Sequence, residues 1–567
     1  MNAPASSIAA VAPECTAAPS LLAGATDRVK SIVQRAFGLR RPAPLDEHQR
    51  RFVTFCEGQW KPRTDGGEPL LLMHQTEWYP SILAYSYFTN ALARRNGQAL
   101  GSFGFERSAR PLNRLFSAFG AQRILGPREL RRHEKPARRL AAEIFRGLRS
   151  RRDVANIHVE GIALGDLIYD SYLRYHVCST ADLTDRRLLS TIEDALTRFF
   201  AGRELLDRRN VSMLLIDHGV YVDGGVLARL AIERGIPVYH LPYKPAVMLQ
   251  LDPALFPHHV EGPGSAPAGM RSPKLPLPFH RFREMFAALP GAEQAALRAR
   301  GRERLQQRLS GQFDFRVLVG GSAYQAATAG ERALTESGRP RIAVMLHDFC
   351  DAPHAYRDLL FADHYEWTCW LFERAAQSGC DWYAKPHPNS AHDKGKAQLN
   401  DRVIGELKAR FPHIHFLPPS VSNRQLIEEG VHAVFTGYGT VGHEFAFVGI
   451  PVVNAGDNPH INYGFNFHPR SIAELGELVD NAGELSLSID PEEVAEFAYM
   501  RSVHFANREY HTVDFVPARM EESPEAFRRI GSSEILSCVA EEPEQKHAAI
   551  EEYLDRVYAD RRHVLPA

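Results

Sequence analysis

Short apolar runs of strand length alternate with longer, helix-patterned stretches in two regions of the chain. This alternation is typical of parallel sheets covered by helices, so it predicts an α/β protein with two doubly wound domains. If the two sheets face each other, their carboxyl ends border a cleft, where ligands bind in open α/β folds. The predicted strands cover residues 70–74, 99–103, 212–217 and 236–241 in the first region, and 342–347, 382–385, 414–417, 433–436 and 450–454 in the second.

Two predicted helices have a clear apolar face. Within residues 366–378, apolar side chains recur at i, i+3, i+4 and i+8 from Trp367, which predicts a helix with a core-facing stripe. Residues 545–558 place Ile550 and Leu554 on one face and predict an amphipathic helix near the C-terminus.

A Pro-, Gly- and Ser-rich segment at residues 261–269 and a polar link at 330–340 separate the two regions, so we place the domain boundary near residue 335. We expect the C-terminal extension to pack back across the domains. The expected parts are a disordered tail with a lead-in helix (1–39), an N-terminal Rossmann-like domain (40–335) with a helical insert (257–335), a C-terminal Rossmann-like domain (336–490) and a helical extension (491–567).

Composition narrows the class of protein. The 567 residues are 44% hydrophobic and 24% charged, which leaves ample material for two cores. The formal net charge of −1 gives no support to a nucleic-acid partner. The seven cysteines include no C-x-x-C pair, so neither a zinc site nor a redox motif is indicated, and a reduced cytosolic setting is the simpler account.

The ends and charge runs of the chain bear on its location. Residues 1–20 lack the basic start and apolar run of a signal peptide, and no stretch approaches the roughly 18 apolar residues that span a bilayer. We expect a cytoplasmic protein, with peripheral association at the inner face of the plasma membrane as an open alternative. The basic segment 107–152 fits an acidic polysaccharide or anionic lipid, although such a run is more often a solvated helix face.

The sharpest motif is Lys385-Pro-His-Pro388, directly after a predicted strand. The prolines hold Lys385 and His387 extended, so the two side chains point to the same side. A lysine supplies a point charge and a histidine a hydrogen-bond donor, which together suit a phosphate. The alternative is a rigid proline turn with incidental side chains.

A second motif, Thr436-Gly-Tyr-Gly-Thr440, joins a predicted strand to a short helix that begins near Val441. Glycines 437, 439 and 442 let the backbone approach a ligand, and free amides at the helix start attract an anion. Glu444, about one turn into the helix, is placed to accept hydrogen bonds from ribose hydroxyls; a capping-box role is the alternative.

These motifs, with Gly449-Ile-Pro451, resemble the donor half of bacterial capsule and surface-polysaccharide glycosyltransferases. The groups named by the resemblance are the capsule Kdo-transferases and, more distantly, the bacterial polysialyltransferases, which carry an "HP" motif and a later Ser/Thr-Gly segment. The resemblance implies a GT-B fold, a CMP- or UDP-linked sugar donor, and a reaction that needs no metal and no cofactor.

The resemblance also implies roles for individual residues. His387 and Lys385 would contact the donor phosphate, Glu444 would bind ribose, and a loop would line the phosphate pocket. The loop residues are Thr436, Gly437, Gly439 and Thr440, followed by Gly442 at the helix start.

Further candidates follow other predicted strands of the second region. His347 ends the first of these strands and Asn454 the last, so both belong to the edge where a donor would lie. Asp348 and Asp351 follow His347, but each also suits the cap of a following helix.

Transfer with inversion needs a base for the acceptor hydroxyl, and we look for it in the first region. We favour Asp166 or Asp217, with His218 beside the latter; a helix-cap role is the alternative for both aspartates. Other loop positions that qualify are His74, Glu77, Glu160 and His240.

The expected reaction moves a sugar from the nucleotide donor onto a capsule or surface polysaccharide, or onto its lipid-linked primer. The acceptor would bind the first domain, and the expected partners include polysaccharide assembly machinery at the membrane. Three alternatives share the fold: a nucleotide-sugar epimerase, a polyol-phosphate transferase, and a non-catalytic scaffold in envelope polysaccharide assembly.

Overall fold

The computed structural model describes most of the chain, which divides into two units, Met1–Leu45 and Asp46–Ala567. All elements below belong to the second unit. The expected tail (1–39), the Pro/Gly/Ser-rich segment (261–269) and Pro388 lie outside the described residues. Those described are 44–61, 68–104, 110–241, 248–251, 279–311, 323–324, 332–355, 359–387, 394–504, 515–520, 526, 529–559 and 565–566.

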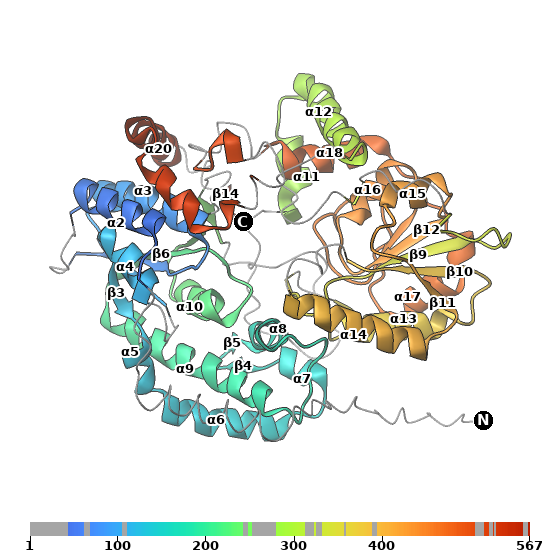
Figure 1. The fold of residues 1–567 in the computed structure, drawn as a ribbon, viewed down its shortest axis with the longest axis horizontal. Helices are drawn as coiled ribbons and strands as arrows, with labels where there is room; N and C mark the ends of the chain where they lie inside the picture. The colour runs from blue at the N-terminus through green and yellow to red at the C-terminus, as the bar shows by residue number, and fades with distance from the viewer. Residues whose placement is uncertain are drawn as a thin grey trace. The chain divides into compact units, whose positions relative to one another are not determined.

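The first large sheet has the order β14-β8-β7-β6-β1-β2-β3. Figure 1 labels its strands β14, β6 and β3. All neighbours in it are parallel except β7 and β8, which are antiparallel. The chain moves from β1 to β2 and β3 on one side and later to β6 and β7 on the other, so the sheet is doubly wound. Its strands are β1 (Leu70–His74), β2 (Ala99–Phe103), β3 (Gln122–Leu125), β6 (Val211–Ile216), β7 (Val238–His240), β8 (Leu249–Gln250) and β14 (Leu565–Pro566).

The second sheet has the order β11-β10-β9-β12-β13, and every neighbouring pair is parallel. It is also doubly wound, because the chain runs from β9 to β10 and β11 and then returns to β12 and β13. The strands are β9 (Arg341–Met345), β10 (Asp381–Lys385), β11 (Ile414–Phe416), β12 (Ala433–Thr436) and β13 (Val452–Asn454). A separate antiparallel pair is formed by β4 (His158–Val159) and β5 (Ile162–Ala163).

Helices follow the strands in both halves. In the first they are α2 (Glu47–Gln59), α3 (Tyr79–Asn96), α4 (Arg110–Ala118), α5 (Pro127–Arg131), α6 (Glu134–Gly147), α7 (Arg151–Ala155), α8 (Gly165–His176), α9 (Arg186–Arg208) and α10 (Val222–Glu233). Next come η2 (Phe279–Arg281), α11 (Phe282–Ala287), α12 (Gly291–Leu309), α13 (His364–Ala375), α14 (Lys394–Arg410), α15 (Asn423–Glu428), α16 (Val441–Phe447), α17 (Ile472–Asp480) and η4 (Ala482–Glu484). The last are α18 (Pro491–Ser502), η6 (Ala518–Met520), η7 (Ser533–Ala540) and α20 (Pro543–Ala559).

This architecture confirms the predicted fold class, a GT-B-like α/β fold with two doubly wound sheets and a helical C-terminal extension. All nine predicted strands are present. They were visible because strands such as β1 and β10 are buried along their whole length and are therefore mostly apolar. The edge strand β3 was missed because it is only half buried, and β8 and β14 because they are two residues long. That the two sheets face each other across a cleft stays a prediction.

The C-terminal extension contacts both halves. Tyr553 of α20 packs on Phe88 of α3, with ring centroids 5.8 Å apart, and β14 pairs with β8 in the first sheet. In the second half, Phe497 of α18 packs on His443 of α16, with ring centroids 5.1 Å apart. Helix α18 also packs on α12, and the Arg298–Glu496 ion pair (2.9 Å) joins these two helices. The domain limits at residues 335 and 490 stay predictions.

Helices α12 and α18 approach closely at Gly301, where a methyl group would fall 2.0 Å from the carbonyl oxygen of Ala495. We therefore expect Gly301→Ala to destabilise the protein by about 1–3 kcal/mol through overpacking. The matched control is Gly405→Ala in the middle of α14, where nothing lies within 4 Å and alanine should stabilise by up to about 1 kcal/mol. Thermal unfolding of the two variants checks the contact, and equal shifts would contradict it.

Candidate functional site

In the second sheet, the chain adds strands first on one side of β9 and then on the other, so β9 has β10 and β12 as its neighbours. Ligands bind at such a switch point, beyond the carboxyl ends of the strands. Lys385 is the last residue of β10, Thr436 is the last residue of β12, and His347 follows β9 by two residues. Strand pairing thus brings together side chains that are about 90 residues apart in sequence.

Lys385 is a buried cation, for which the structure shows no ion-pair partner among the described residues. Its side chain is only 4% exposed because β10 lies between β9 and β11. Among the described residues, no carboxylate forms an ion pair with Lys385. Burial lowers the pKa of Lys385 to about 8, and the charge of Glu444 only partly opposes this effect. A buried, unpaired ammonium is costly, so an anionic ligand would relieve a real penalty here.

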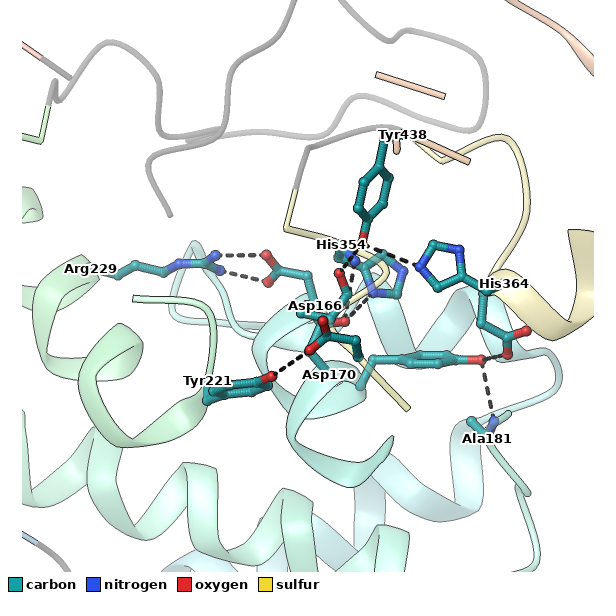
Figure 2. Close-up of polar contacts among 12 residues, drawn as sticks. Asp166, Asp170, Ala181, Tyr221, Arg229, His354, His364 and Tyr438 are labelled. Carbon is teal, nitrogen blue, oxygen red and sulfur yellow. Dashed lines mark hydrogen bonds and ion pairs between the residues drawn. The ribbon is translucent and has the colours of Figure 1, made fainter. Parts of the chain in front are cut away.

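Three histidines and a tyrosine line the same edge. The ring of His347 stacks on His364 (centroids 4.3 Å apart) and lies 5.5 Å from His387 and 4.8 Å from Tyr438. The His364 Nε2 atom is 3.2 Å from the Tyr438 hydroxyl (Figure 2). Burial, followed by the neighbouring His347, lowers the pKa of His387 to about 4. The imidazole of His387 is therefore neutral near pH 7 and offers a hydrogen bond, not a charge.

The loop after β12 has the course expected from its motif. The Thr436 hydroxyl accepts a hydrogen bond from the Gly439 amide (3.2 Å), and Thr440 precedes α16 as its N-cap without a side-chain cap bond. Gly437 and Gly442 do not have a positive φ, so backbone conformation does not require glycine there; the lack of room for a side chain does. A methyl group at Gly437 would lie 3.3 Å from the His364 ring, and one at Gly442 would lie 2.3 Å from the His460 ring.

Glu444 lies near this site, but both its oxygens already have partners. It accepts from Arg308 Nε of α12 (2.9 Å) and from the Tyr324 hydroxyl (3.0 Å), and its residue is 2% exposed. Burial acts to raise the pKa of Glu444, but Arg308, His443 and Tyr324 together hold the pKa below its usual value. A ribose would have to share or displace these contacts, so the ribose role of Glu444 stays a prediction.

Two further residues of the second half end strands or follow them. Asp348 accepts from Lys396 Nζ (2.9 Å). Burial acts to raise its pKa, but Lys396, with His347 and His387, lowers the pKa below its usual value. Asn454, at the end of β13, is fully buried, and its Oδ1 atom finds no hydrogen-bond partner in the described part of the chain. An unpaired buried acceptor of this kind suits a ligand donor or an ordered water.

The first-half candidate Asp166 forms a bidentate ion pair. Its two oxygens each accept a 2.7 Å hydrogen bond from the guanidinium of Arg229, a residue of α10 that is 6% exposed. Arg229 also donates to the Ala163 carbonyl. This geometry fixes the start of α8 and leaves Asp166 poorly suited to take a proton from an acceptor.

Asp217 and His218 follow β6, beside the end of β1. The Asp217 oxygens accept from the Thr76 and Ser81 hydroxyls, both at 2.6 Å. His218 is exposed and stacks on Tyr221, with ring centroids 5.3 Å apart. The structure therefore brings both residues to the switch point of the first sheet, as predicted from sequence, without testing either as a base.

A cluster at the junction of the two halves was not singled out from the sequence. Fully buried Asp170 of α8 pairs with His354 Nδ1 (2.6 Å), and the Tyr169 hydroxyl donates to Asp363 (2.6 Å), the N-cap of α13 (Figure 2). The Tyr221 hydroxyl donates to Asp351 at 3.4 Å. Periodicity could not reveal these pairs, because they join residues about 130 or more positions apart.

Metal clusters and membrane-spanning helices are both absent from the described residues. No group of three or more His, Cys, Asp or Glu side chains has the geometry to hold a metal ion. No helix among these residues combines the length and the apolar character needed to cross a membrane.

No protein-family model and no curated protein matches the chain. Among solved structures, the β-Kdo 2,4-transferase of KpsC from Thermosulfurimonas dismutans is similar, with 13% identity over 51% of this chain and 79% of that one and a TM-score of 0.30. The UDP-GlcNAc 2-epimerase from Neisseria meningitidis, bound to UDP-GlcNAc, shares 10% identity over 87% of this chain and 100% of that one, with a TM-score of 0.21. At such values, neither likeness carries an argument about activity.

The Arg308–Glu444 pair yields a stability prediction. Arg308→Met would leave the carboxylate of Glu444 buried without its cation, which costs about 3–5 kcal/mol. The control is Arg424→Met, because Arg424 and Glu428 form an exposed pair on α15 whose loss should change stability by less than about 1 kcal/mol. Chemical denaturation measures both, and a similar small effect from both variants would show that Glu444 is not held by Arg308.

Proposed function

We propose that the protein is a metal-independent glycosyltransferase that uses a nucleotide-sugar donor. The observation that carries the proposal is the buried ammonium of Lys385 at the switch point of the second sheet, without an ion-pair partner among the described residues. The neutral imidazole of His387 and the ring of His347 flank the same edge, and the loop from Thr436 to Thr440 completes it. This set of groups favours a phosphate ester.

The charged and polar groups at this edge can stabilise the departing phosphate. When the bond between the sugar and the phosphate breaks, negative charge grows on the departing phosphate. Lys385 would neutralise part of that charge, and His387 would donate a hydrogen bond to it. A protein cation in this position performs the charge stabilisation for which other transferases use a divalent metal.

The acceptor and the setting belong to the same proposal. The acceptor is a capsule or surface polysaccharide or its lipid-linked primer, bound by the first half, where His74, Asp217 and His218 meet at the ends of β1 and β6. Such an acceptor would bring the protein to the inner face of the plasma membrane. An epimerase would leave the nucleotide attached to the sugar, whereas a transferase or a polyol-phosphate transferase releases it, so product analysis separates these reactions.

Nucleotide binding is the first test. We expect one of CMP, UDP, GDP or CDP to raise the unfolding temperature, because a ligand at about a hundred times its Kd adds roughly 2.7 kcal/mol to stability. The variant His387→Ala should lose most of this gain. Folded wild-type protein that responds to none of the four would contradict the proposed function and favour a non-catalytic scaffold.

The lowered pKa of Lys385 predicts a pH dependence. The ammonium is charged below about pH 8 and loses its proton above it. Nucleotide affinity should therefore fall as the pH rises above 8, by up to about tenfold per pH unit. Lys385→Met should bind weakly at pH 7 and lack this dependence.

Titration calorimetry from pH 7 to 9.5 measures this effect. The control variant is Lys408→Met, because Lys408 is exposed on α14, and it should behave as the wild type. An affinity of the wild-type protein that stays constant across this range would show that Lys385 does not bind the phosphate.

A further inference from the structure

Four carboxylates near the switch points are already engaged. Asp166 is held by Arg229, Asp217 by two hydroxyls, and Asp348 by Lys396. The N-cap Asp363 accepts from Tyr169, Thr180 and the Glu366 amide. A general base needs an atom that is still able to accept a proton, so these four carboxylates are poor candidates.

His354 differs from them in its second ring nitrogen. Its Nδ1 atom lies 2.6 Å from Asp170, and its backbone amide donates to the same carboxylate oxygen at 3.3 Å. A carboxylate only accepts hydrogen bonds, so Nδ1 must carry the proton and Nε2 the lone pair. Among the described residues, Nε2 has no hydrogen-bond partner, and the His354 side chain keeps 10% of its surface exposed.

The Asp170–His354 pair joins the two halves at the edge of the candidate donor site. His354 lies on the loop after β9, whereas Asp170 lies on α8 of the first half. The Tyr438 hydroxyl ties this loop to the donor edge, because it donates to the Ala352 carbonyl at 2.6 Å and contacts His364 (Figure 2). The ring contacts from His364 through His347 lead to His387.

We propose that His354, oriented by Asp170, is the general base that activates the acceptor hydroxyl. This inference rests on the proposed function. The acceptor proton moves to His354 Nε2 as the acceptor oxygen bonds to the anomeric carbon. The bond from that carbon to the phosphate oxygen breaks, and its electron pair leaves with the nucleotide. Asp170 stabilises the imidazolium, which then releases its proton to water.

Other charged or titratable groups that face His354 must be considered in a pH experiment. They include Tyr169 and Asp170 from α8, and His364 from α13. His364 is neutral at ordinary pH, because burial holds its pKa well below the usual value. Protonation of His354 would remove its lone pair, so turnover should fall on the acid side of the pH profile.

The test needs no knowledge of the acceptor, because water can replace it. Nucleotide release from UDP-N-acetylglucosamine and CMP-N-acetylneuraminic acid is followed from pH 5 to 9. We expect His354→Gln and Asp170→Asn to lower turnover by about 10²- to 10⁴-fold. In His354→Gln the acid limb should also vanish, while the nucleotide Kd stays within about twofold of the wild type.

Two control variants separate catalysis from structure. Tyr169→Phe removes the neighbouring hydrogen bond between the halves and should lower the unfolding temperature without changing the shape of the pH profile. His133→Gln alters a remote histidine–carboxylate pair (2.7 Å to Glu204) and should leave turnover unchanged.

Three outcomes would overturn the proposal. The first is full turnover by folded His354→Gln. The second is that Asp351→Asn loses turnover while His354→Gln keeps it, which would make Asp351 the base. The third is a wild-type protein that binds nucleotide but releases none from either probe. This result would contradict the proposed function and, with it, the role of His354 as a base. Intact nucleotide binding distinguishes this failure from unfolding of the protein.

Discussion

In each sheet, the parallel strands end at one common edge, and this constraint decides where the chemistry of the chain lies. The winding of the second sheet places β10 and β12 on either side of β9, so that Lys385, His347 and the loop from Thr436 meet where the direction of winding reverses. The same constraint sets Asp217 beside the end of β1 in the first sheet. Partners from the surrounding helices and loops then pair with some of these side chains and leave others able to bind a ligand.

Whether a charged side chain has an ion-pair partner distinguishes the groups that stabilise the fold from those that we expect to bind a ligand. Buried Arg229 pairs with partly buried Asp166, and buried Glu444 pairs with partly buried Arg308; these ion pairs hold α8 to α10 and α16 to α12. Lys385 is equally buried but has no ion-pair partner among the described residues, and its lowered pKa reflects that. A fold keeps such a cation only at a cost in stability, which an anionic ligand would recover.

The sequence was sufficient to predict nine of the strands, because buried parallel strands are continuous apolar runs. It also placed Lys385, His387 and Thr436 at strand ends, since prolines and glycines mark where these strands stop. It could not show that Arg229 pairs with Asp166, or that Arg308 pairs with Glu444, because these partners come from distant helices. The Asp170–His354 pair was hidden for the same reason: Asp170 lies within the tyrosine-rich face of α8, where periodicity indicates only a buried helix.

The central claim is that a nucleotide phosphate binds at the end of β10. The most direct measurement is a crystal structure of the protein with its stabilising nucleotide. The account predicts a phosphate oxygen within hydrogen-bond distance of Lys385 Nζ and close to the His387 ring, at the carboxyl ends of β9, β10 and β12. A nucleotide bound away from this edge, with Lys385 still buried and uncontacted, would contradict it.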